Sequence, residues 1–115
     1  MQIVEYADWA LRKFFEEARK QPWFDNTIFV LEGDHGKLVG DAECELPESY
    51  THIPLMIYSS RIHPEEKNTF GGQVDIQPTI LGLLNIDYLQ NNFGVDLLKE
   101  ERPCMFYTCL LYTSP

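Results

Sequence analysis

The feature that most constrains the fold is a short run of apolar and β-branched residues, 27–31, that passes directly into a polar segment bounded by glycines. A strand that is apolar at every position is typically covered on both faces, as in a parallel α/β sheet. The next residues place Asp34 and His35 between Gly33 and Gly36. The sequence therefore predicts a buried strand that ends at two side chains able to bind a ligand.

The elements on either side of this strand indicate an α/β architecture. Residues 4–20 carry apolar side chains three or four positions apart, which predicts an amphipathic helix with one buried stripe. Residues 53–58 predict a second strand, with Pro54 near its start, where the lost N–H is tolerated. The order helix, strand, loop, strand, helix points to part of a three-layer α/β/α domain with a mainly parallel sheet. The stripe of the first helix consists of Val4, Ala7, Leu11, Phe14 and Ala18.

The second predicted helix follows Asp75. We expect Asp75 to accept N–H bonds as its N-cap, while Pro78 lies in the first turn, where its missing N–H is harmless. Asn85 is expected to end the helix in a left-handed conformation. Residues 93–98 read as a short closing turn. The apolar face of this helix is predicted to contain Ile76, Ile80, Leu83 and Leu84.

The charge of the chain limits its partners. Lys and Arg total 9 against 18 Asp and Glu, which gives a formal charge of −9. Clustered basic residues, which a nucleic-acid binder needs, are lacking, so nucleic acid is excluded as a partner. An acidic chain remains compatible with divalent cations, although acidity also serves solubility alone. No stretch approaches the ~20 apolar residues that span a bilayer, and no signal peptide is recognisable.

Asp34 and His35 are the candidate metal ligands. In open α/β sheets, ligands collect at the carboxyl ends of the strands. Neighbouring side chains on a regular strand point to opposite faces, so these two can share an ion only if the chain bends, which Gly33 and Gly36 permit. A carboxylate with a neutral imidazole suits zinc or manganese better than calcium. The alternative is that Asp34 caps a turn and His35 lies on the surface.

Other polar residues have weaker signals. His52 precedes the second strand and could face the same end of the sheet as Asp34, or could be an ordinary polar residue in front of a strand. Lys37 could meet an anionic substrate oxygen, or could be a solvated lysine. His63 reads as part of a solvated turn. No nucleophile can be argued from spacing, because Ser and Thr residues here lack a His-and-acid arrangement.

Three segments together resemble the alkaline phosphatase superfamily, closest to its sulfatase and lipoteichoic-acid-synthase-like phosphoglycerol transferase branch. Residues 29–36 are similar to its strand and Asp-His-Gly segment, 53–58 to its Pro-containing strand, and 71–81 to its glycine-entered Asp-x-x-Pro-Thr helix. We therefore expect residues 1–108 to be the C-terminal part of a sulfatase-like catalytic domain. Residues 109–115 resemble translated adapter sequence and are expected to be a non-native tail.

The resemblance implies a metal-dependent enzyme. Members use a Thr, Ser or modified Cys nucleophile on a divalent metal, here Mn or Zn with Ca as a possibility, and form a covalent intermediate on phosphorus or sulfur. Asp34 and His35 would be metal ligands, and the nucleophile would precede Met1, so the fragment alone is expected to be inactive. The implied substrate is a sulfate or phosphate ester, including a lipid-linked phosphoglycerol.

The resemblance also implies a location, and other interpretations stay open beside it. The parent protein is expected to be membrane-anchored, with its catalytic domain outside the cytoplasm and its membrane helices in the missing part. One alternative is a non-catalytic α/β interaction domain with a degenerate metal site. Another is a cytosolic metal-dependent phosphodiesterase.

Overall fold

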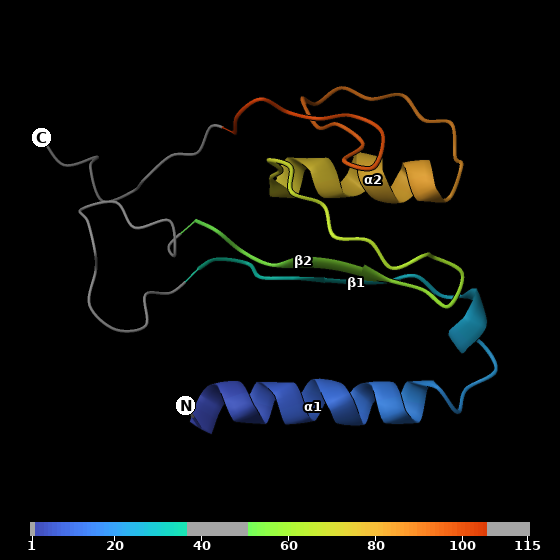
Figure 1. Ribbon diagram of the computed structural model, residues 1–115. Coiled ribbons are helices and arrows are strands. Elements are labelled where there is room, and N and C mark those ends of the chain that lie inside the picture. The colour runs from blue at the N-terminus through green and yellow to red at the C-terminus, as the bar shows by residue number, and fades with distance from the viewer. Residues whose placement is uncertain (1, 37–50, 106–115) are drawn as a thin grey trace, which may run out of the picture. The chain divides into compact units, whose positions relative to one another are not determined.

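The computed structural model describes residues 2–36 and 51–105, so Lys37 and the expected tail at 109–115 lie outside the described residues (Figure 1). The chain divides into two compact units, Met1–Pro64 and Glu65–Pro115. The elements of the first unit are α1 (Gln2–Ala18), the 3-10 turn η1 (Phe24–Asn26), β1 (Phe29–Glu32) and β2 (Leu55–Tyr58). Those of the second are the 3-10 turn η3 (Gln73–Asp75) and α2 (Ile76–Leu83).

The two strands pair in the antiparallel direction, with Phe29 opposite Tyr58 and Glu32 opposite Leu55. The expectation of parallel strands is therefore wrong for this pair. A run of apolar residues indicates that both faces of a strand are buried, and it does not indicate the direction of the neighbouring strand. Because mainly parallel sheets often include one antiparallel strand, a three-layer domain with a mainly parallel sheet stays a prediction for the whole domain.

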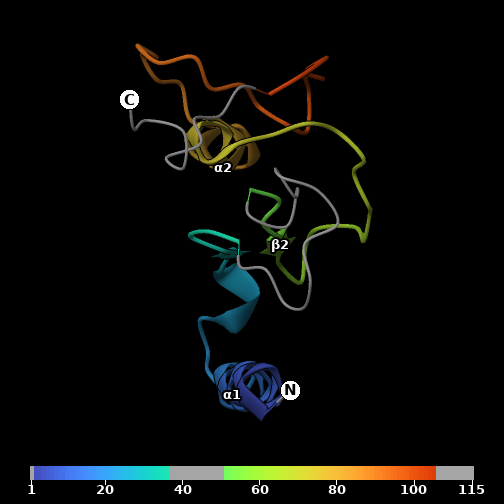
Figure 2. The same cartoon turned by 90° about the vertical axis from the view of Figure 1, so that its left-hand side faces the viewer.

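An aromatic cluster around Phe29 forms the packed centre of the first unit. Figure 2 views α1 nearly end-on and shows η1 between this helix and the strands. The rings of Phe15 and Phe24 lie 5.1 and 5.4 Å from that of Phe29, and Tyr58, its partner across the sheet, lies 6.1 Å away. Each such aromatic pair contributes about 0.5–1.5 kcal/mol beyond the area it buries. The cluster thus attaches the C-terminal part of α1 to the strands.

The apolar stripe predicted for the first helix is exposed over most of its length. Ala18 is its buried member, at 4% exposure, whereas Val4 and Phe14 are 69% and 50% exposed. Phe15, which is outside the stripe, is the half-buried residue that packs on Phe29. The prediction of one buried stripe is therefore wrong for the described chain, because only the last turns of α1 contact the strands. No helix of the described residues is both long and apolar enough to cross a membrane.

The helix α2 has Pro78 in its first turn and a left-handed Asn85 just after its end, as the sequence predicts. Pro78 is its third residue and is buried. Asn85 has φ 52°, and the N–H of Ile86 donates to the carbonyl of Leu81 at 3.0 Å, which is the six-to-one bond of a Schellman cap. The most buried side chains of α2 are Pro78 and Thr79, so its predicted apolar face is not its main packing surface; Leu84 of that face is 49% exposed.

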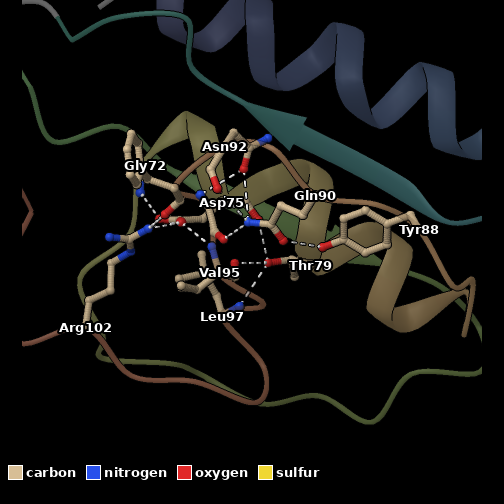
Figure 3. Close-up of polar contacts among 11 residues, drawn as sticks. Gly72, Asp75, Thr79, Tyr88, Gln90, Asn92, Val95, Leu97 and Arg102 are labelled. Carbon is tan, nitrogen blue, oxygen red and sulfur yellow. Dashed lines mark hydrogen bonds and ion pairs between the residues drawn. The ribbon is translucent and has the colours of Figure 1, made fainter.

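Asp75 has a different role from the predicted helix cap. Its carboxylate makes no capping bond to the first N–H groups of α2. Instead, it accepts the N–H of Gly72 at 2.9 Å and that of Val95 at 2.8 Å, and it pairs with the Arg102 guanidinium at 2.7 Å (Figure 3). The side chain of Asp75 is 0% exposed. The carboxylate therefore joins the start of α2 to Val95 and Arg102, which lie 20 and 27 positions further along the second unit.

Thr79 continues this network one helical turn later. Its hydroxyl donates to the carbonyl of Asp75 at 2.7 Å and accepts the N–H of Leu97 at 3.0 Å. The backbone at Gly94 approaches so closely that an added Cβ would lie 2.9 Å from Pro78 Cγ and collide with the carbonyl of Val74. The segment containing residues 94–97 is thus held directly against the start of α2.

Candidate metal-binding site

The candidate site begins where β1 ends. The N–H of Gly33 donates to the carbonyl of Pro54 at 3.2 Å, which extends the strand pairing by one residue beyond Glu32. A Cβ at residue 33 would lie 3.3 Å from Ile53 Cβ, so glycine allows this close approach. The backbone then bends at Asp34 and His35. The chain therefore leaves strand geometry here, as a shared ion would require.

The side chains of Asp34 and His35 converge. Asp34 Oδ2 and His35 Nε2 are 3.8 Å apart, and both side chains are strongly exposed. The other carboxylate oxygen, Oδ1, accepts the backbone N–H of His35 at 3.0 Å. His35 Nδ1 lies 2.9 Å from the carbonyl oxygen of Gly36. Because a carbonyl only accepts hydrogen bonds, this contact assigns a proton to Nδ1, and in the neutral imidazole the lone pair is then on Nε2.

This arrangement fits a divalent cation. Ligand distances of about 2.0–2.2 Å place two donors of one tetrahedral ion about 3.4 Å apart. The observed 3.8 Å is slightly longer, and two exposed side chains can close that difference by small rotations. A carbonyl that accepts the second N–H of a ligating histidine is the usual outer contact of such sites. Within residues 2–36 and 51–105, no group of three or more His, Cys, Asp or Glu side chains could hold an ion, so this pair would supply part of a shell.

His52 lies at the same end of the strand pair as Asp34, a placement that the sequence left open. Figure 1 shows the end of β1 and the start of β2 side by side. The antiparallel pairing is what brings them together, because in a parallel pair the start of one strand lies at the opposite edge from the end of its neighbour. The His52 side chain is exposed, and so is that of His63, which follows β2.

Arg102 is the polar residue that sequence reasoning missed. Its guanidinium bonds to Asp75 and to the carbonyl of Phe93, and its side chain is 21% exposed. The sequence offers no periodic signal for this contact, since the paired residues are 27 positions apart. These contacts hold the second unit together, and they give Arg102 a structural role.

A comparison with protein families decides the classification. The family model described as Sulfatase matches residues 1–86, which include β1, the Asp34–His35 bend and α2. The chain belongs to the sulfatase family. This membership confirms the resemblance stated above and implies an α/β fold of the alkaline phosphatase type, with which the described helices and strands agree.

The curated relatives of this sulfatase-family chain include lipoteichoic acid synthases. It is 29% identical over 113 residues to lipoteichoic acid synthase 1 of Bacillus subtilis and 30% identical over 116 residues to lipoteichoic acid synthase 2 of the same organism. It is 31% identical over 117 residues to the lipoteichoic acid synthase of Staphylococcus aureus. Each alignment covers 87% of this chain and 18% of the relative. The chain therefore spans less than a fifth of their length, and no solved structure gave a significant match.

Proposed function

We propose that the full-length protein is a metal-dependent enzyme that hydrolyses or transfers a sulfate or phosphate ester group, with Asp34 and His35 as two of its metal ligands. The observation that carries this proposal is the convergence of Asp34 Oδ2 and His35 Nε2 to 3.8 Å at the end of β1. Membership of the sulfatase family supports the type of reaction. Because no nucleophile can be argued from the spacing of Ser, Thr and Cys in this sequence, we place the nucleophile and further acidic ligands in another part of the protein.

The two residues contribute different properties to such a site. The carbonyl of Gly36 holds the proton on His35 Nδ1, so the Nε2 lone pair is available to an ion. Asp34 Oδ2 brings a negative charge beside that lone pair. A bound divalent ion would supply Lewis-acid stabilisation of charge on the transferred group and on the nucleophile that forms the covalent intermediate. An imidazole in the donor set favours Mn or Zn over Ca.

Among possible substrates, a lipid-linked phosphoglycerol has the most support. The relatives reported above are named lipoteichoic acid synthases, which favours phosphoglycerol transfer over sulfuric-ester hydrolysis. A lipid-linked substrate also suits a protein anchored to the membrane with its catalytic domain outside the cytoplasm, which is the location we propose. Lys37 stays a candidate for contact with an anionic substrate oxygen and lies outside the described residues.

Metal titration of the full-length protein tests the proposal. We expect Asp34→Ala and His35→Ala each to lower the affinity for Mn²⁺ or Zn²⁺ by about 100-fold or more, since changes to outer contacts alone cost about 10–100-fold. The matched control is His63→Ala, which removes an exposed histidine beyond the far end of β2. Isothermal titration calorimetry with each ion gives the affinities. Unchanged affinity in both site variants would contradict the proposal.

A second candidate function is a non-catalytic α/β interaction domain with a degenerate metal site. The observation in its favour is that Asp34 Oδ1 accepts the N–H of His35, so the carboxylate also serves as a local turn cap. A cap of this kind needs no ion. Under this alternative, the titration would show no metal-affinity difference between the wild type and the Asp34→Ala variant.

A further inference from the structure

The antiparallel pairing places one more polar side chain near Asp34 and His35. Two contacts hold the backbone before β2 against Gly33: the 3.2 Å bond from the Gly33 N–H to the Pro54 carbonyl, and an approach to Ile53 that leaves only 3.3 Å for an added Cβ. His52 is the next residue before Ile53, and its side chain is exposed. Its backbone is therefore fixed beside the candidate site, while its imidazole is free to turn toward a ligand.

The distance between His52 and Asp34 suits a contact from His52 to the substrate better than a bond from His52 to the metal. Strand spacings of about 4.8 Å across and 3.3 Å along the chain place the Cα atoms of His52 and Asp34 roughly within 10 Å of each other. Among residues 2–36 and 51–105, His52 does not combine with Asp34 and His35 into a group that could hold an ion. A side chain at this distance can instead reach the outer oxygens of a group that occupies the site.

The described charged groups near the site are carboxylates, so an anionic substrate would need a hydrogen-bond donor there. Asp34 and the exposed Glu32 both repel an anionic substrate. In the described part of the first unit, the Lys and Arg side chains lie elsewhere. These are Arg12 and Lys13 on α1, Arg19 and Lys20 just after it, and Arg61 beyond the far end of β2. Among the described side chains that the strand pairing brings to this end, the N–H donors are His35 and His52, and Lys37 lies outside the described residues.

We propose that His52 contacts the anionic group of the substrate, donating an imidazole N–H to a sulfuryl or phosphoryl oxygen, and is not a metal ligand. This inference rests on the proposed function and deepens it by naming a residue for substrate binding. A hydrogen bond to a charged oxygen is stronger than one between neutral groups, so its loss lowers affinity by about 10-fold or more.

The test separates metal affinity from anion affinity in the full-length protein. Titration calorimetry measures first Mn²⁺, then inorganic phosphate and inorganic sulfate on the Mn²⁺-loaded protein. For His52→Ala we expect Mn²⁺ affinity within about twofold of the wild type and affinity for phosphate or sulfate lower by about 10-fold. His52→Gln, which keeps an N–H donor, should recover part of that loss. His63→Ala is the control for removing an exposed histidine.

Each other outcome has a defined meaning. Unchanged anion affinity in His52→Ala overturns the inference, and so does a fall in Mn²⁺ affinity as large as that of Asp34→Ala, because His52 would then be a ligand. If Asp34→Ala loses Mn²⁺ while His52→Ala binds anions normally, only this inference fails. If Asp34→Ala keeps full Mn²⁺ affinity, the proposed function fails and this inference fails with it.

Discussion

A fully buried carboxylate needs donors for its oxygens, and Asp75 has three. Two are backbone N–H groups, from Gly72 and Val95, and one is the Arg102 guanidinium. Removing one partner of a buried ion pair is costly because the other charge is left without compensation. The Asp75 carboxylate thus contacts residues 72, 95 and 102 at once. We expect the stability of the second unit to depend strongly on this carboxylate.

We expect Asp75→Ala to lower the free energy of unfolding of the full-length protein by about 3 kcal/mol, since Arg102 and two backbone N–H groups lose their acceptor. Urea denaturation followed by circular dichroism measures the change. Asp87→Ala, which removes an exposed carboxylate from the same unit, serves as the control and should have little effect. If the two variants are equally stable, the buried pair between Asp75 and Arg102 makes no net contribution to the free energy of unfolding.

Single residues also show which parts of the structure could be predicted from the sequence. Asp34 and His35 could be named as candidates from a local pattern, since they directly follow an apolar run between two glycines, and the family resemblance is what favoured them as ligands. The convergence of their side chains depends on a bend whose form only coordinates give. Arg102 could not be selected, because its partner Asp75 looks like an ordinary helix cap in the sequence. Local contacts are thus readable from sequence, and contacts across 27 positions are not.

At the scale of elements, the end of α2 gives a sharp prediction about backbone conformation. Asn85 has φ 52°, a left-handed conformation that costs most residues about 1–2 kcal/mol. We expect Asn85→Ala to lower the free energy of unfolding by about 1 kcal/mol, whereas Asn85→Gly leaves it unchanged or raises it slightly. Thermal unfolding of both variants in the full-length protein measures the difference. An alanine variant as stable as the glycine variant would contradict this account of the cap.

The two elements that sequence reasoning described wrongly share one cause. Periodicity shows which residues of α1 lie on one face, and it does not show whether another element covers that face. In the same way, the apolar run of β1 predicts a strand without its direction relative to β2. The place of Pro78 in the first turn of α2 and the left-handed cap at Asn85 were predictable because both residues act through their own backbone preferences, whereas the capping bond expected from Asp75 is not formed.

At the scale of the whole molecule, α1 carries more exposed apolar surface than a stable isolated protein would. The exposed large apolar side chains of α1 are Ile3, Val4, Tyr6, Trp9, Leu11 and Phe14, at 43–84% exposure. Contiguous surfaces of this kind usually pack against further chain or a partner. The described sheet has two strands, and a two-stranded sheet is marginally stable by itself.

We therefore expect the 115-residue chain, expressed alone, to be poorly stable and prone to aggregate through unpaired strand edges and the exposed face of α1. Size-exclusion chromatography, binding of a hydrophobic dye and thermal unfolding test this, with the full-length protein as the reference. A soluble monomer that unfolds in one cooperative transition would contradict the expectation.

The register of β1 and β2 also constrains how this sequence can change during evolution. The same ladder that sets Phe29 opposite Tyr58 also sets Gly33 beside Pro54. Since side chains alternate between faces, inserting or deleting one residue within β2 would turn its following residues to the other side. Such a change would put either the aromatic packing at Tyr58 or the Gly33–Pro54 contact out of register, because both belong to one ladder. Viable length variation is therefore expected outside the ladder, where neither would be disturbed.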